Sequence, residues 1–339
     1  MRSPAASSNP DISNPDISNP AAARPAGAGP RERFWFPELP LGRIAALRVL
    51  ANAFILLDLV WWTPFARPHR DIPAFYQPLA IGRLLHLPTP TPHVVDIVEL
   101  LLVLTAAASL VLAAGFARRT PPLLTRVLGV AAALLYGEWM VIAMSYGKVD
   151  HDRFALLVLL AVVATVGPAS LGEKRRSEVA GWAVRCVQVA VVATYLLAAV
   201  AKFRFGGFGW VNGSTLVWAI IRRGTVLGDP LLHVRALLHV TQWGIVAMEL
   251  GTPMLLVLDH LSRTGPAKHR RLAGRLCVAY LWGLVAFHLM TFATISILFL
   301  PHVVCLLAFA PLERAPEQWR VLRRRFASTP ALSWIRSSA

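Results

Sequence analysis

The chain has 339 residues, of which 56% are hydrophobic and 15% are charged, and its mean hydropathy is +0.55. This composition is typical of a multi-pass membrane protein and argues against an ordinary soluble domain. The formal net charge of +16 also raises nucleic-acid binding, which the distribution of basic residues must decide. Three cysteines lie inside apolar runs without CxxC or metal-like spacing, so no dithiol centre, disulfide framework or metal site is predicted.

Residues 1–40 are rich in Pro, Ala and Ser and contain the tandem repeat SNPDISNPDISNP. They hold no apolar stretch long enough for a signal peptide, so we predict a disordered N-terminal tail. Residues 313–339 are predicted to form a basic cytoplasmic C-terminal tail, whose Arg323, Arg324 and Arg325 suit anionic lipid headgroups.

The region between the tails consists largely of apolar runs. Runs of spanning length cover about 44–64, 94–116, 123–145, 182–202, 241–258 and 275–292. The runs at 154–170 and 295–311 are short or contain proline, yet they are too apolar to lie in water. We therefore predict an all-α, polytopic transmembrane helix bundle of about eight spans over residues 41–312.

The basic residues then predict the orientation of the bundle. Eight spans put both termini on one side, which holds 23 Lys and Arg residues against 10 on the other, with Arg48 inside a span. The positive-inside rule therefore places both termini in the cytoplasm of a cell-membrane protein. Because the basic residues are spread over five segments, they form no continuous stripe, and we predict lipid bilayer and no nucleic acid as partner.

Two outer loops are not uniformly polar. Residues 215–221 and 231–239 read as short amphipathic helices between glycines and a proline, and residues 65–93 look similar. We expect these pieces to lie at the outer face and to cover a pocket there.

Ionisable side chains within apolar runs are costly, so each needs a partner or a function. Asp58, Asp96, Glu99 and Glu138 fall near the outer ends of their runs, and Glu249 falls in mid-span. Each carboxylate could hold the bundle together through hydrogen bonds to neighbouring helices, or it could line a pocket. Their clustering in the outer half favours a pocket.

The outer hairpin SYGKVDHDRF, residues 145–154, carries several reactive side chains, namely Tyr146, Lys148, Asp150, His151 and Asp152. A loop histidine is often solvated and inert. His151, however, lies between two carboxylates that would favour its protonated form or fix its tautomer.

Lys202 lies where an apolar run gives way to FRFGGFGWVNG, and His288 lies near the outer end of the run at 275–292. Lys202 could simply extend its amine to the membrane surface, and His288 could serve only as a helix-packing donor. Both runs point outward and the hairpin of His151 is outside, so we expect the three side chains to reach one level and to converge.

In order along the chain, SYGKVDHDRF, YLLAAVAKFRFGGFGWVNG, ELGTPMLLVLDHL and AFHLMTFATISILFLPH resemble the HTTM family of vitamin K-dependent gamma-carboxylase-like membrane domains. The likeness covers roughly residues 40–312, and the element from Tyr195 to Gly213 is its most specific part. HExxH, P-loop and nucleotide-binding motifs are absent from the sequence.

The resemblance implies roles for individual residues. Lys202 would be the base that deprotonates a reduced vitamin K-type quinone (menaquinol or phylloquinol), His151 would assist carboxylation, and His288 would lie in the same site. Oxygen would convert the quinol into a strong base that removes a proton from the acceptor before carbon dioxide adds. The expected pocket is lined by Asp58, Glu138, Tyr146, Asp150, Asp152 and Trp210.

A lysine acts as a base near neutral pH only when burial favours its uncharged form. We expect Phe203, Phe205, Phe208 and Trp210 to seal Lys202 from water.

Because 28 residues follow Pro311, we expect no large substrate-binding domain after the spans. The acceptor could then be a lipid, a small acid or a partner protein, including a separate exported soluble domain. The alternative function is a non-catalytic or redox-associated membrane partner protein. A transporter would show inverted repeats or broken helices at the midplane, and the sequence has no convincing internal repeat.

Overall fold

The computed structural model describes residues 29–116 and 120–320. Almost all of its regular structure is helical. The helices are α1 (Pro30–Trp35), α2 (Leu41–Trp61), α3 (Ala80–Leu84), α4 (Pro92–Val111), α5 (Pro122–Met144), α6 (Phe154–Val163), α7 (Glu178–Gly206), α8 (Gly209–Asn212), α9 (Thr215–Arg223), α10 (Arg235–Gly251), α11 (Pro253–Thr264), α12 (Ala267–Ile295) and α13 (Leu300–Leu306). Two short strands, β1 (Leu39–Pro40) and β2 (Arg176–Ser177), pair antiparallel with Leu39 opposite Ser177. The all-α prediction is confirmed.

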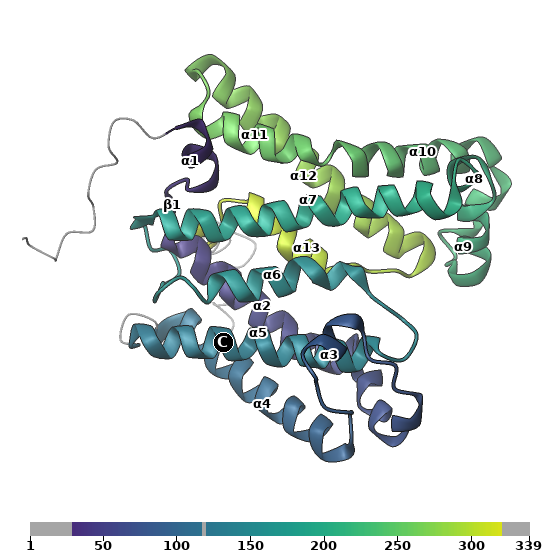
Figure 1. Cartoon of the computed structure of the whole chain (residues 1–339). Helices are drawn as coiled ribbons and strands as arrows, with labels where there is room; N and C mark the ends of the chain where they lie inside the picture. The colour runs from purple at the N-terminus through teal and green to yellow at the C-terminus, as the bar shows by residue number, and fades with distance from the viewer. Residues whose placement is uncertain (1–28, 117–119, 321–339) are drawn as a thin grey trace, which may run out of the picture.

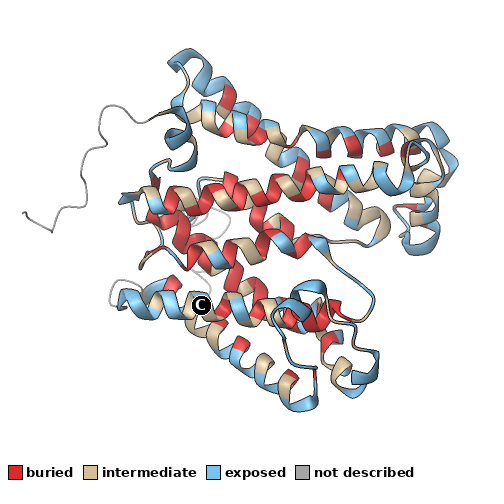
Figure 2. Cartoon of the chain, viewed as in Figure 1, coloured by how far each residue is buried: buried red, intermediate tan, exposed pale blue. Residues whose placement is uncertain are grey.

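The long helices form a bundle with two distinct ends (Figure 1). The strand pair joins the start of α2 to the start of α7 at one end, while α3, α8 and α9 lie at the other. Buried residues concentrate in the central helices, and exposed residues predominate in the peripheral ones (Figure 2). In the apolar 18-residue stretch of each spanning helix, the buried share is 61% for α2 and 56% for α7, but only 22% for α4 and 17% for α12. The apolar outer surfaces of α4 and α12 therefore suit contact with lipid.

Five described helices are long and apolar enough to cross a membrane, namely α2, α4 with its π-helical extension, α5, α7 and α12. The pair α10 and α11 makes a sixth span if it crosses as one bent unit. These apolar helices indicate a membrane protein. The predicted count of eight is not confirmed, because α6 has 10 residues and the apolar helix at Leu300–Phe309 is also short.

Arg48 caps the C-terminal end of α6. This arginine was left unexplained inside a span by the sequence, and it is 8% exposed in α2. Its guanidinium donates to the carbonyl oxygens of Val163, Val166 and Gly167, where α6 ends. A cation at a helix C-terminus satisfies carbonyls that have no partner within the helix and interacts favourably with the helix dipole.

Part of the predicted N-terminal tail is structured. Residues 30–40 form α1 and β1, although the sequence predicted disorder through residue 40. The guanidinium of Arg185 lies 4.5 Å from the ring centroid of Phe34 and donates to the Phe34 carbonyl oxygen at 3.0 Å. This long-range contact fixes α1, and a local composition argument could not detect it. Residues 1–28, and residues 321–339 of the predicted C-terminal tail, lie outside the described ranges.

Candidate functional site

Lys202 lies in the last turns of α7 and forms an ion pair with Glu249 of α10. Its Nζ is 2.6 Å from Oε1 and 2.8 Å from Oε2 of the carboxylate. The side chains are 19% and 6% exposed. On another side, Nζ lies 5.1 Å from the ring centroid of Trp210 in α8. The amine is thus held between a carboxylate and an aromatic face, which is a geometry for a positioned amine rather than a freely solvated one.

Local sequence explains both partners of Lys202. Gly207, with φ 55° and ψ −156°, ends α7 in a conformation that is essentially restricted to glycine, and the turn returns Trp210 over the amine. On the other side, Pro253 cannot continue α10, so the chain bends by 46° between α10 and α11. Thr252 at the bend donates its hydroxyl to the carbonyl oxygen of Glu249 at 2.8 Å. Glu249 is therefore in the last turn before the break.

The expected aromatic seal around Lys202 is only partly present. Phe205 is 81% exposed and Phe208 is 67% exposed, so these two rings do not cover the amine. Phe203 packs edge-on against Phe208 at 5.7 Å. Among the four predicted aromatic residues, Trp210 is the one with a described contact to the amine. Successive residues of a helix point in different directions, which is why neighbours in sequence do not surround one side chain.

A second group lies toward the interior of the bundle, and we call it the histidine cluster: Tyr195, His288, Phe299 and His302. The Tyr195 hydroxyl is 2.6 Å from Nε2 of His288. The ring of His302 lies 4.6 Å from that of Tyr195 and 5.8 Å from that of His288, both edge-on. The three polar side chains come from α7, α12 and α13 and are at most 4% exposed. Among the described residues, Nδ1 of His288 and both ring nitrogens of His302 have no hydrogen-bond partner.

The two groups share one face of α7. Tyr195, Ala199 and Lys202 are spaced four and three residues apart, which aligns them on a helix. His151 in the 3-10 turn at His151–Arg153 is exposed, and its ring lies 6.4 Å from that of Phe299. Phe299 in turn lies 5.5 Å from the ring of His288. Lys202, His151 and His288 are therefore at the same end of the bundle, with His151 at the edge of the histidine cluster rather than in contact with Lys202.

The hairpin carboxylates belong to a different arrangement, the Arg153 network. Asp58 is 0% exposed and accepts from Arg153 at 2.9 Å and from the Tyr136 hydroxyl at 3.0 Å. Arg153 also lies 3.4 Å from each of Asp150 and Asp152. Of the predicted pocket residues, these three carboxylates thus contact one arginine, and Asp150 also pairs with Lys148 at 3.0 Å. This geometry favours the alternative interpretation from the sequence, in which these carboxylates hold neighbouring helices together.

Burial and charge act in opposite directions on this network. Burial raises the pKa of Asp152, and the nearby charge of Arg153 only partly offsets this effect. Burial would by itself lower the pKa of Arg153, but the Asp58 carboxylate and its neighbours outweigh this effect and raise that pKa. The pair that holds the α2 end to the hairpin is therefore Arg153 with Asp58.

Tyr146 and Glu138 are also apart from Lys202. The Tyr146 ring stacks on His69 at 3.8 Å, and its hydroxyl donates to the His69 carbonyl oxygen at 3.0 Å. Burial lowers the pKa of His69 and so favours the neutral form of the ring that stacks. Glu138 in α5 is half-buried, and its Oε1 has no hydrogen-bond partner among the described residues. Tyr146 thus anchors the outer loop, while the role of Glu138 as a pocket residue stays a prediction.

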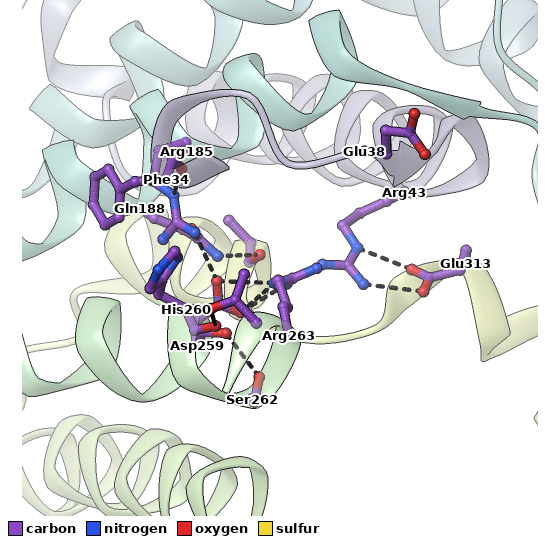
Figure 3. Close-up of polar contacts among 12 residues, drawn as sticks. Phe34, Glu38, Arg43, Arg185, Gln188, Asp259, His260, Ser262, Arg263 and Glu313 are labelled. Atoms are coloured by element: carbon purple, nitrogen blue, oxygen red, sulfur yellow. Dashed lines mark hydrogen bonds and ion pairs between the residues drawn. The ribbon is translucent and has the colours of Figure 1, made fainter. Parts of the chain in front are cut away.

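The opposite end of the bundle has its own polar network, which Figure 3 shows. Asp259 of α11 accepts from Arg185 at 3.1 Å and from Arg263 at 2.6 Å. Arg43 of α2 forms two hydrogen bonds, 2.9 and 3.0 Å, to the carboxylate of Glu313. These contacts join α7 to α11 and α2 to the segment after α13, so we interpret them as structural.

Sequence reasoning missed two members of the site. Tyr195 opened the motif that was singled out, but no role was assigned to it. No role was predicted for His302, which lies in the apolar run at 295–311. A signal was available for Tyr195, because it lies seven residues before Lys202 and hence on the same helical face. For His302 the approach of α13 to α7 was required, and that is a long-range feature.

Within the described ranges, no group of three or more His, Cys, Asp or Glu side chains is arranged to hold a metal ion. Comparison of the chain with models of known protein families, with curated proteins and with solved structures finds no match.

Proposed function

We propose that this chain is an HTTM-like membrane enzyme, similar in its chemistry to the core of the vitamin K-dependent gamma-carboxylase. In this proposal it oxidises a reduced vitamin K-type quinone and couples that oxidation to proton abstraction from, or carboxylation of, an acceptor. The observation that carries the proposal is the ion pair of Lys202 and Glu249 on the same helical face as the hydrogen-bonded Tyr195 and His288.

The residues present fit a quinol in two respects. A quinol offers hydroxyl groups on an aromatic ring, and the ring nitrogens of His288 and His302 without a protein partner can bond to hydroxyls. Trp210 provides an aromatic face beside the amine. When bound, the quinol would supply reducing electrons to oxygen, giving the epoxide and water as carbon dioxide adds to the acceptor.

In the proposed first step, the protein removes one proton from a quinol hydroxyl. A lysine removes a proton only as a free amine, and the Glu249 carboxylate at 2.6 Å is the group placed to receive the proton that the ammonium carries. Lys202 would then accept a proton from a quinol hydroxyl. Trp210 excludes water from one side of the amine, and Tyr195 fixes the ring of His288 through Nε2.

The proposed setting is the cell membrane, with eight membrane segments, of which α6 and the helix at Leu300–Phe309 are of about half length. Both termini are cytoplasmic and the site faces outward. This orientation is supported by the 23 to 10 distribution of Lys and Arg. The location of α8, α9 and the hairpin at one end of the bundle supports a site at that end (Figure 1). A lipid, a small acid or an exported partner protein would serve as acceptor.

The alternative proposal, a non-catalytic or redox-associated membrane partner, is favoured by the same ion pair. A lysine fully neutralised by Glu249 can be structural, because a paired charge is tolerated within a membrane. The bend between α10 and α11 is a feature that a transporter would also show, although proline breaks occur in many membrane helices.

The test is quinol oxidation by the purified protein in lipid nanodiscs. Epoxide formation from menaquinol and phylloquinol is followed in the wild type and in Lys202→Ala, Lys202→Arg and Glu249→Gln. Arg204→Ala is the matched control, because Arg204 is basic and exposed on the same helix, two positions away. We expect loss of turnover in both Lys202 variants and wild-type turnover in the control. Unchanged turnover in both Lys202 variants would remove the catalytic proposal.

A further inference from the structure

His302 stands out among the buried polar side chains of the described chain. It is 1% exposed, and neither of its ring nitrogens has a hydrogen-bond partner among the described residues. Buried polar groups in proteins nearly always have a partner, and a side chain with two unpaired ring nitrogens is unusual. A group of this kind commonly marks a place where a ligand or water supplies the missing bonds.

The neighbours of His302 make the site more specific. The ring of His288 lies 5.8 Å from that of His302, and its Nδ1 also has no partner among the described residues. The other nitrogen of His288 is occupied by the Tyr195 hydroxyl. Two imidazoles therefore offer three ring nitrogens within one cluster. A neutral imidazole carries one donor and one acceptor, so the cluster suits a hydroxyl group, which both donates and accepts.

The backbone spacing along α7 relates the histidine cluster to Lys202 and sets the scale of a ligand that would reach both. Tyr195 and Lys202 are seven residues apart on one face of α7, which corresponds to about 10 Å along the helix axis. Ala199 lies between them, is fully buried and carries only a methyl group. An aromatic ring with a hydrogen-bonding oxygen at each end spans a separation of this order. A ring with a single hydroxyl could bond at one end only.

We infer that His302, together with His288, binds the second oxygen of a para-quinol whose first oxygen faces Lys202. This inference rests on the proposed function and extends it by assigning the two oxygens of one ligand to the two groups of the site. His302 is then a binding residue that sets the direction of the ring. A bound water molecule can donate and accept hydrogen bonds as a quinol hydroxyl does. The experiment must therefore distinguish water from a quinol as the partner of His302.

The experiment compares two probes under anaerobic conditions: menadiol, which has two para hydroxyls, and 1-naphthol, which has one. Affinities come from the ligand-induced shift in the melting temperature of the full chain in nanodiscs. In the wild type we expect menadiol to bind about tenfold more tightly than 1-naphthol, the ratio for one additional hydrogen bond of about 1.4 kcal/mol. In His302→Phe the two probes should bind about equally.

Two further variants control the result. His302→Gln keeps a donor and an acceptor and should retain most of the preference for menadiol. His260→Phe removes a half-buried histidine near Phe34 at the opposite end and should leave the preference unchanged. Wild-type preference in His302→Phe would overturn the inference while leaving the proposed function intact, and water would then be the partner of His302. Failure of the wild type to bind either probe would overturn the quinol site and this inference together.

Discussion

Glutamine in place of Glu249 is expected to destabilise the protein strongly, because it leaves the ammonium of Lys202 without its counter-charge. The two contacts are 2.6 and 2.8 Å, and the side chains are 19% and 6% exposed. At about 3 Å and an effective dielectric constant of about 20, the Coulomb attraction is roughly 5 kcal/mol. Desolvation offsets much of that attraction in the intact pair, but it does not offset the cost of one remaining charge.

The single variants Glu249→Gln and Lys202→Met should each lower the free energy of unfolding by about 3 kcal/mol, the lower end of the range for buried pairs, since Lys202 retains some exposure. The double variant removes both charges and should lose clearly less than the sum of the two. A coupling free energy of about 2–3 kcal/mol is expected from the cycle. Denaturant-induced unfolding in mixed micelles measures all four proteins.

The matched control is the pair of Lys148 and Asp150, with Nζ to Oδ1 at 3.0 Å and a lysine that is 67% exposed. Lys148→Met should cost less than about 1 kcal/mol, because exposed ion pairs contribute little. If Glu249→Gln costs no more than Lys148→Met and the cycle shows no coupling, Lys202 is solvated, and the argument for a positioned amine is refuted.

Three further predictions concern the supporting structure. Arg153→Met leaves the fully buried Asp58 carboxylate without its cation and should lower the free energy of unfolding by about 3–5 kcal/mol in denaturant titrations; a loss below about 1 kcal/mol would contradict the network. Burial would raise the pKa of Glu313, but the hydrogen bonds and charge of Arg43 outweigh it and hold that pKa below 4.5. This pair therefore stabilises the protein above pH 4.5 and loses its effect as the pH falls through the depressed pKa. Glu313→Gln should lower the melting temperature at pH 7, and in acid the melting temperatures of the variant and the wild type should converge. An equal difference in melting temperature at both pH values would exclude this pH dependence. A Cβ added at Gly181 would overlap a carbonyl oxygen of the segment before β1, so Gly181→Ala should displace α1 and cost about 1–3 kcal/mol in thermal unfolding, whereas unaltered protease resistance of α1 would contradict that packing.

The helical class of the fold followed from the apolar runs, but their exact extents did not. The run at 241–258 was predicted as one span, whereas Pro253 starts a new helix and bends the chain by 46°. The proline was visible in the sequence, and its effect depends on whether neighbouring helices accommodate a bend or a kink. For α6 the local signal was Gly167 followed by Pro168, whereas the capping of its end by Arg48, more than a hundred residues earlier in the chain, could not be predicted from the sequence.

For the site, the residue types were predictable and the pairings were not. Composition singled out Asp58 and Glu249 as costly charges within apolar runs. Their partners, Arg153 and Lys202, lie 95 and 47 residues away, and either carboxylate could have paired with either cation on sequence grounds. The outcome separates one structural carboxylate from one that holds the candidate base. Hydrophobic periodicity defines helix faces but not which faces meet.

The separation of these two networks bears on whether Lys202 can react. Arg153 is shared by Asp58, Asp150 and Asp152, and Lys148 also pairs with Asp150, so the hairpin carboxylates have cationic partners other than Lys202. Lys202 therefore has one described acidic partner, Glu249, and a proton leaving the amine has a single carboxylate to accept it. With one carboxylate beside the amine, a single described group can take up a proton from Lys202 and return it. The histidine cluster likewise adds no further carboxylate beside the amine, because the groups that it presents toward the interior are hydroxyl and imidazole groups.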